Sequence, residues 1–447
     1  MLSKESLYKQ SNNVQELLLR FFLLYFLLQA LPLSVQLFQA LTNREPGEPL
    51  FATLFRLARI QPGLTSADSF LNWLLIAILA ALGAGYLPFA FWNDPVKKQR
   101  FIYLVRTLVS YRLAASLFVY GLLKFYPVLA PYPSLSNLNT AYGDFERWKL
   151  FSLSLGVVPG YESFLGAVEI AAGLLLLFRK TAGLGALIIA VFLGNVFMSN
   201  LAYEGGEVVY SFYLLSLALF VFAFDFVKLY NLVVLQAPAA PETPTSGYLS
   251  GAWKKGTWIA RALVLIVFLG LFGFTTKKAS EKNSYQFPAS EGTLGLTGVY
   301  DVEFFAVNGK ALPWDPYDPV RWKDVVIESW PTISIRSNKP VKVFHSNLEH
   351  FSQSDFNRTY ELEGTGGRHY YQYEYHPDKK QLQLINKNPN HAGEGFDLVL
   401  EAISDSTILV KGTDEQQNQY EALLRKKDKK YLLEVARETG RRQRIKL

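Results

Sequence analysis

The chain of 447 residues contains no cysteine. It therefore has no disulfide framework, no thiol redox motif, no thiolate metal site and no iron–sulfur ligand. Methionine is also scarce, because Met198 is the only one besides Met1. The histidines all lie near the C-terminal end, at His345, His350, His369, His376 and His391. The first three quarters of the chain thus have neither the paired histidines that ligate haem nor the His/Cys sets of ordinary copper or zinc centres.

Long apolar runs are absent after Lys277 but frequent before it. A helix needs about 20 apolar residues to cross a bilayer. We therefore predict a membrane α-helical bundle of seven transmembrane helices. The first is expected to be uncleaved, because it lacks a small-x-small cleavage site and has Arg20 inside it. The predicted spans are roughly 14–33, 70–92, 101–128, 161–178, 182–203, 208–229 and 257–275.

Lysine and arginine in the links between these runs predict the orientation, since cytoplasmic links are enriched in them. The bases gather in every second link, and with an odd number of spans this places the N-terminus in the cytoplasm and the chain after Lys277 outside. We expect a bacterial inner-membrane protein with a periplasmic C-terminal domain. The bases concerned are Lys97, Lys98, Arg100, Arg179, Lys180, Lys228, Lys254 and Lys255.

The formal net charge of +7 does not indicate a nucleic-acid partner. Residues 276–447 hold 25 bases and 24 acids, so the part outside the predicted spans is nearly neutral. The excess of bases lies in the membrane part, where it sets orientation. The partner that this distribution indicates is the lipid bilayer.

After about Leu296 the hydrophobic pattern changes to period two, with turn signals such as Asn308-Gly309 between short runs. This pattern predicts an all-β domain, an antiparallel barrel or sandwich. The runs at 298–302 and 420–425 resemble the first and last strands of lipocalin-like barrels. The predicted strands are 298–309, 325–328, 332–336, 341–345, 359–363, 369–375, 381–386, 396–402, 407–411, 419–425 and 431–435.

Two of the predicted outward links carry structure of their own. Residues 51–60 form an amphipathic helix that lies at the membrane interface or packs on the bundle. The link 129–161 is rich in turn formers and ends in a short apolar run, 150–158, that is too short to span; it is a re-entrant or interfacial piece, or a simple cap. The predicted domains are 1–100 (two spans), 101–235 (four-helix module), 236–256 (proline-rich cytoplasmic linker), 257–277 (seventh span) and 285–447 (periplasmic β domain).

Ionisable and amide side chains inside the predicted spans are the strongest functional signal. Glu169 lies within an apolar stretch, and a charge near the bilayer midplane needs a partner or a wet cavity. Arg112 and Lys124 on the preceding span are the candidate partners, about 18 Å apart along the helix. Tyr120 shares a face with Lys124. Glycines at 166, 173, 183, 185 and 194 permit close approach of the helices.

Residues 105–230 resemble the DoxX-like membrane family, a four-helix module related to the quinol-linked subunits of thiosulfate:quinone oxidoreductase. The resemblance rests on Tyr111-Arg112, on Val119 to Lys124, on Gly166 to Arg179 and on Leu193 to Glu204. It implies a quinone, bound without a covalent link, and other redox subunits as partners. The implied site has Glu169, Lys124 and Arg112 as catalytic residues, and Tyr120, Asn195, Asn200 and Tyr203 around the cofactor.

Several functions remain open from the sequence. The leading hypothesis is a quinone-linked redox component without a metal or haem of its own, in which Glu169 exchanges the proton. The alternatives are a non-catalytic envelope protein that binds lipid in its β domain, and an assembly scaffold; a purely structural Glu169 ion pair fits both. No histidine pair has metal-ligand spacing, so no metal site is predicted, and the histidines are expected in loops or at the surface.

Overall fold

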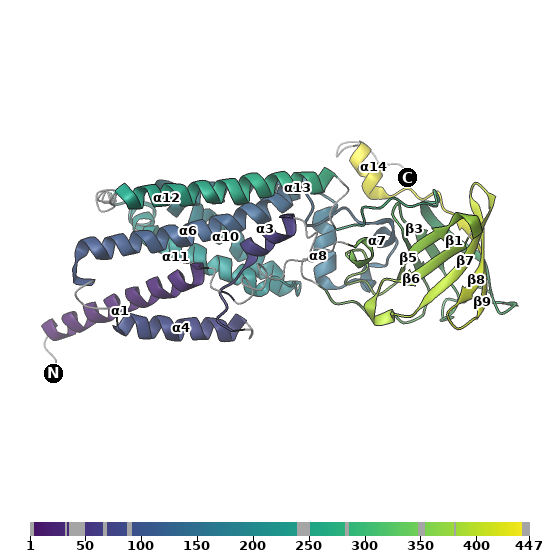
Figure 1. Cartoon of the computed structure of the whole chain (residues 1–447), viewed down its shortest axis with the longest axis horizontal. Helices are drawn as coiled ribbons and strands as arrows, with labels where there is room; N and C mark the ends of the chain where they lie inside the picture. The colour runs from purple at the N-terminus through teal and green to yellow at the C-terminus, as the bar shows by residue number, and fades with distance from the viewer. Residues whose placement is uncertain are drawn as a thin grey trace. The chain divides into compact units, whose positions relative to one another are not determined.

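A computed structural model describes residues 4–31, 34, 50–65, 69–86, 92–238, 251–281, 286–346, 354–379 and 381–439. Most of the predicted linker 236–256, His350 and the basic end 441–446 lie outside these residues. The chain divides into two compact units (Figure 1). The helical unit comprises Met1–Tyr126 and Ser163–Lys278, and the barrel unit comprises Pro127–Glu162 and Ala279–Leu447.

Five helices are long and apolar enough to cross a membrane: α4, α6, α10, α11 and the continuous helix 251–281. The predicted spans at 14–33 and 161–178 are also helical, as α1 and α9, and their crossing stays a prediction. The helices are α1 (Lys4–Ala30), α3 (Leu50–Arg59), α4 (Ser69–Tyr86), α6 (Pro95–Phe125), α9 (Pro159–Leu176), α10 (Arg179–Ala202), α11 (Val208–Val233), α12 (Gly251–Val264), the π-helical η3 (Leu265–Leu271) and α13 (Phe272–Glu281).

Helix α6 forms the centre of the helical unit. Of its apolar window 67% is buried, against 33% for α10 and for α11. Asp94 caps its start by accepting hydrogen bonds from the backbone N–H groups of Val96 (2.9 Å) and Lys97 (3.2 Å), and Pro95 follows in the first turn. Phe118 and Leu113 in its middle are fully buried. The ionisable Arg106 and Lys124 of α6 are nearly buried as well, with side chains 10% and 13% exposed.

Helices α6 and α9 cross closely where two glycines meet. A Cβ atom on Gly166 would collide with the backbone of Gly121 and Phe125, and one on Gly121 would lie 3.0 Å from the carbonyl oxygen of Gly166. This is the close approach that small residues permit between membrane helices. The crossing brings the backbones of Lys124 and Glu169 into neighbouring positions.

The amphipathic helix at 51–60 packs on the bundle, which is one of the two placements that its sequence allowed. As α3, it buries Phe51, Leu54 and Phe55 to 8% exposure or less. The ring of Phe51 stacks on Phe272 with the centroids 5.0 Å apart. Arg56 is exposed on the opposite face.

The β domain is a closed barrel, so of the two predicted architectures the sandwich is wrong. Sequential antiparallel pairing from β1 to β9 is closed by pairing between β1 and β9, which makes an eight-stranded barrel. The short β2 forms a hairpin with the end of β1. The strands are β1 (Gly298–Val307), β2 (Lys310–Ala311), β3 (Asp324–Ile327), β4 (Thr332–Arg336), β5 (His369–His376), β6 (Gln381–Asn386), β7 (Gly395–Ser404), β8 (Thr407–Asp414) and β9 (Gln419–Lys426).

Aromatic side chains pack inside the barrel. Trp322 lies at their centre, with ring centroids at 5.5 Å from Phe305, 5.4 Å from Phe396 and 6.0 Å from Tyr420. Tyr371 adds an edge contact to Phe396 at 5.5 Å. Tyr371 and Tyr373 face this core, as strand alternation predicts. These two tyrosines thus serve core packing.

Three predicted strands are wrong. Residues 341–345 form irregular chain, 359–363 form turns, and 431–435 begin the helix α14 (Leu432–Thr439). The first two contain alternating apolar residues, but neither pairs with a strand. The backbone N–H groups of Leu362 and Glu363 bond to the carbonyl oxygen of Thr359 in a turn, and Phe344 accepts from the N–H of Gly364. Tertiary contacts therefore override the local pattern there.

The segment Pro127–Glu162 folds with the barrel, although sequence analysis assigned it to the four-helix module. It forms α7 (Leu135–Leu138), η1 (Tyr142–Asp144) and α8 (Arg147–Gly156), and we call it the insert. Its apolar run at 150–158 lies mostly in α8, and Lys149 of that helix is fully buried. The apolar run is thus a helix of the barrel unit, and its placement in or at the membrane, or as a cap, stays a prediction.

Candidate functional site

Lys124 and Glu169 form a buried ion pair in the helical unit. The Nζ atom of Lys124 lies 2.5 Å from Oε1 of Glu169, and the two side chains are 13% and 2% exposed. The ammonium also lies 5.4 Å from the centre of the Phe192 ring on α10, within reach of a cation–π interaction. Oε2 of Glu169 is buried and has no hydrogen-bond partner among the described residues.

Tyr120 lies one helical turn from Lys124 and joins a second polar group. Its ring packs 5.6 Å from that of Tyr210 and 5.8 Å from that of Phe55. The carboxylate of Glu207, at the start of α11, interacts electrostatically with Tyr120 and is ion-paired with Arg59 of α3. Sequence analysis missed Glu207 and Arg59, because both lie in links between the predicted spans.

Arg112 does not pair with Glu169. Its guanidinium donates hydrogen bonds to the carbonyl oxygens of Ala58 (2.8 Å) and Ile60 (2.5 Å), at the C-terminal end of α3. Ser116 Oγ, which accepts from Arg112 at 2.6 Å, donates to Ala58 as well. A cation at a helix C-terminus satisfies carbonyls that have no partner within the helix. The contacts of Arg112 therefore hold α3 on the bundle.

The three remaining predicted site residues are Asn195, Asn200 and Tyr203, all on or just after α10. Asn195 is exposed on α10. The Nδ2 atom of Asn200 donates to the carbonyl oxygen of Val196 (3.0 Å) in its own helix. Tyr203 follows the last residue of α10, where its backbone N–H bonds to Ser199, and is 41% exposed. The structure thus pairs Lys124 with Glu169 and places Tyr120 one helical turn away on α6. Asn200, in contrast, bonds within its own helix, and Asn195 and Tyr203 are exposed.

A second ion pair in the same unit joins Arg106 of α6 and Asp225 of α11. Arg106 precedes Lys124 by 18 residues, or roughly 27 Å along the helix. Its side chain is 10% exposed, similar to that of Lys124. The two pairs therefore mark different depths of one helix and can be compared directly by substitution.

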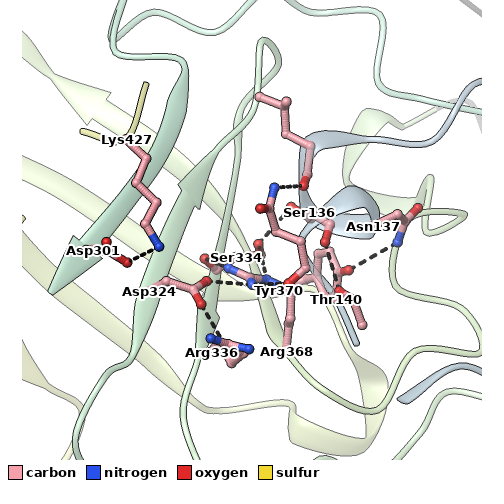
Figure 2. A network of polar contacts seen from close by, with 12 residues as sticks. Ser136, Asn137, Thr140, Asp301, Asp324, Ser334, Arg336, Arg368, Tyr370 and Lys427 are labelled. Atoms are coloured by element: carbon pink, nitrogen blue, oxygen red, sulfur yellow. Dashed lines mark hydrogen bonds and ion pairs between the residues drawn. The ribbon is translucent and has the colours of Figure 1, made fainter. Parts of the chain in front are cut away.

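The barrel unit contains a buried polar network between the insert and the barrel (Figure 2). Glu328 accepts hydrogen bonds from the backbone N–H (2.8 Å) and hydroxyl (2.6 Å) of Ser136. Ser136 also bonds to Ser334 at 2.7 Å, which accepts from Nε of Arg368 at 2.8 Å. Arg368 pairs with Asp324 at 2.6 Å. Burial raises the pKa of the Glu328 carboxyl.

Lys387 and Glu361 add a fully buried ion pair to this network. Their side chains are each 0% exposed and lie 2.7 Å apart. Asn137 of the insert donates to the carbonyl oxygen of Glu361 at 2.9 Å. Lys149 reaches the carbonyl oxygen of Tyr360 and lies 3.5 Å from the centre of its ring. The insert is thus joined to the barrel by buried charges, which are costly to expose singly.

The histidines differ from expectation in one case. His369, at the start of β5, is 4% exposed, and burial lowers the pKa of its imidazole to about 4. It lies near His391 and Glu394, which are far from it in sequence. His345 is exposed beside Glu146, and His376 is exposed at the end of β5, as predicted.

Comparison of the chain with protein-family models, with curated proteins and with solved structures gave no match.

Proposed function

We propose that the protein is an integral protein of a bacterial inner membrane, with seven crossings and the barrel unit on the periplasmic side. The five candidate spans and the distribution of bases in the links support this placement. A further argument comes from the connectivity of the barrel unit.

The insert and the strands belong to one compact unit, so both must lie on the same side of the membrane. The chain between Glu162 and Ala279 must then cross an even number of times. Three candidate spans lie in that interval: α10, α11 and the helix 251–281. If all three cross, a fourth crossing is needed, and α9 is the remaining described helix there. Its 18 residues suffice, although Glu162 and Glu169 lower its hydropathy.

The absence of cysteine makes this topology easy to test. Single cysteines at the exposed Ser154 and Ser404 should react with a membrane-impermeant maleimide from the periplasmic side. A cysteine at Lys180, in the link between α9 and α10, should react only from the cytoplasmic side. Labelling of the Lys180 and Ser154 positions from the same side would contradict a crossing by α9.

Within the helical unit, we propose a binding site for a polar headgroup at Lys124 and Glu169, in a quinone-linked redox component similar to DoxX-like proteins. The observation that carries this is a buried ion pair with unused capacity for hydrogen bonds. Lys124 has three N–H donors, and Oε2 of Glu169 is buried and unpartnered. An intramembrane carboxylate that only fixes two helices would gain by satisfying both of its oxygens.

The residues suit a quinone ring, whose carbonyl oxygens accept hydrogen bonds and whose reduction takes up protons. The Lys124 ammonium would donate to one carbonyl. Glu169 would hold or release a proton at Oε2, and Lys124 would stabilise its charged form. The rings of Phe192 and Tyr120 would provide apolar and aromatic surface beside the polar atoms. We do not propose a ligand inside the barrel, because aromatic side chains pack against one another there.

The first experiment is mass spectrometry of lipid-soluble molecules that co-purify with the full chain. We expect the parent to retain quinone and the double variant Lys124→Met/Glu169→Gln to lose it. The matched control is Arg106→Met/Asp225→Asn, which removes the other ion pair of α6 and should retain the quinone.

Two results would contradict the proposal. One is the absence of quinone from the parent protein, even after it is purified in mild detergent and incubated with quinones extracted from the membrane. The other is equal loss from both double variants, which would show that ion pairs of α6 act only by holding the helices together. Protein level and thermal unfolding of each variant separate loss of ligand from loss of fold.

A further inference from the structure

Two histidines and a glutamate from separate segments meet on the barrel unit. His369 begins β5, His391 ends the short helix η6 (Pro389–His391), and Glu394 directly precedes β7. One ligand atom from each lies within 4.8 Å of the others. Gly393 has φ +86°, a left-handed conformation that suits glycine, and the turn it makes brings Glu394 back beside His391.

The imidazole of His369 is arranged as that of a metal ligand usually is. Its Nε2 lies 3.4 Å from the carbonyl oxygen of Lys339. Because a carbonyl oxygen only accepts, Nε2 carries the proton and Nδ1 carries a lone pair. This Nδ1 is buried and has no hydrogen-bond partner among the described residues. Histidine ligands typically donate their other ring N–H to a backbone carbonyl in this way.

His391 and Glu394 already interact with each other. The Nδ1 atom of His391 lies 3.1 Å from Oε1 of Glu394, and its Nε2 accepts from the backbone N–H of Lys342 at 2.9 Å. For Nδ1 to bind a cation, the ring proton has to move to Nε2, and the Lys342 hydrogen bond has to break. That loss is small beside the bonds that a metal ion forms with two imidazoles and a carboxylate.

We propose that His369, His391 and Glu394 bind a divalent transition-metal ion, with zinc as the best match. Two imidazole nitrogens and one carboxylate oxygen are a common protein ligand set for zinc, in which water takes the fourth position. The side chain of His391 is 10% exposed and that of Glu394 is 31% exposed, so the ion can enter from solvent. The ammonium of Lys339 lies 2.7 Å from Oε2 of Glu394, and its positive charge weakens binding of a cation there.

The test is isothermal titration calorimetry. The full chain in detergent is first treated with a chelator and then titrated with Zn²⁺. We expect one saturable site, at least tenfold weaker in His369→Gln and in Glu394→Gln. His376→Gln changes an exposed histidine on the same strand and should bind as the parent does. Lys339→Met should bind several times more tightly, because it removes the opposing charge. In the parent, zinc should also speed hydrogen exchange of the Lys342 amide.

Thermal unfolding of each variant shows whether the barrel unit is folded. If His369→Gln does not fold, Glu394→Gln alone tests the loss of zinc affinity. Parent protein without a saturable zinc site would overturn the proposal. So would unchanged affinity in Glu394→Gln, or equal losses in His369→Gln and His376→Gln. This site is independent of the quinone proposal, and neither result bears on the other.

Discussion

The most demanding prediction concerns the ion pair of Lys387 and Glu361. Lys387→Met removes the ammonium that lies 2.7 Å from Oε1 of Glu361 and also donates to the carbonyl oxygen of Arg358 at 2.9 Å. Both side chains are 0% exposed, and Oε2 of Glu361 has no described hydrogen-bond partner. The substitution therefore leaves a carboxylate buried without a cation.

Breaking a buried pair in this way costs about 3–5 kcal/mol of unfolding free energy. For a unit of about 200 residues, such a loss lowers Tm by roughly 6–20 °C. In the double variant Lys387→Met/Glu361→Gln no charge is left buried, so at least half of this loss should be recovered. The control is Lys411→Met, which breaks the exposed pair with Glu421 (55% and 43% exposed) and should cost at most about 1 kcal/mol.

The assay is thermal unfolding of the full chain in detergent, followed by near-ultraviolet circular dichroism at one scan rate for all variants. The reasoning is refuted if Lys387→Met shifts Tm no more than Lys411→Met does. It is also refuted if the double variant is less stable than the single one, because the penalty would then not come from an unpaired carboxylate.

Three further predictions concern other contacts. Gly166→Val should abolish close packing of α6 on α9 and lower the yield of folded protein in membranes. Gly194→Val is the control, because a Cβ atom at Gly194 has open space around it, and equal yields of the two variants would contradict the close crossing. Arg112→Met should expose the segment 50–65 to limited proteolysis, while Arg56→Met at an exposed position should leave the digestion rate unchanged. Burial raises the pKa of Glu328, so the folded protein holds this proton to higher pH than the unfolded chain, and the stability that it contributes falls as pH rises above about 4.3. The Tm of the parent should therefore drop relative to that of Glu328→Gln as the pH rises above this value, and parallel Tm curves would argue against it.

The sequence predicted the secondary structure well where periodicity is long. All seven apolar runs are helical, and eight of the eleven predicted strands form, because apolar length and alternation are local properties. Closure of the barrel and the position of the insert depend on contacts between residues far apart in the chain. The hydrogen bonds between Ser136 and Glu328, for example, correspond to no hydrophobic periodicity in either segment, so the sequence pattern could not predict them.

The candidate site shows the same limit. The pairing of Lys124 with Glu169 could be expected, since two opposite charges in neighbouring spans have few other partners. The binding of Arg112 to backbone carbonyls at the end of α3 could not be expected, because every residue has a carbonyl and the sequence does not mark which one is bound. His369 and His391 lie 22 positions apart in the printed sequence, so their meeting follows from the fold and not from a motif.

The insert affects the order in which the protein can be completed. Ribosomes synthesise residues 127–162 before α10, α11 and α12, and the strands that bury Ser136 and Lys149 emerge only after residue 279. The last strand, β9, pairs with β1 to close the barrel. In the proposed topology, the insert's polar groups stay hydrated on the periplasmic side until these strands emerge there. Assembly of the barrel unit would then require an even number of crossings between the insert and the strands, and it would act as a structural check on the topology of the nascent chain.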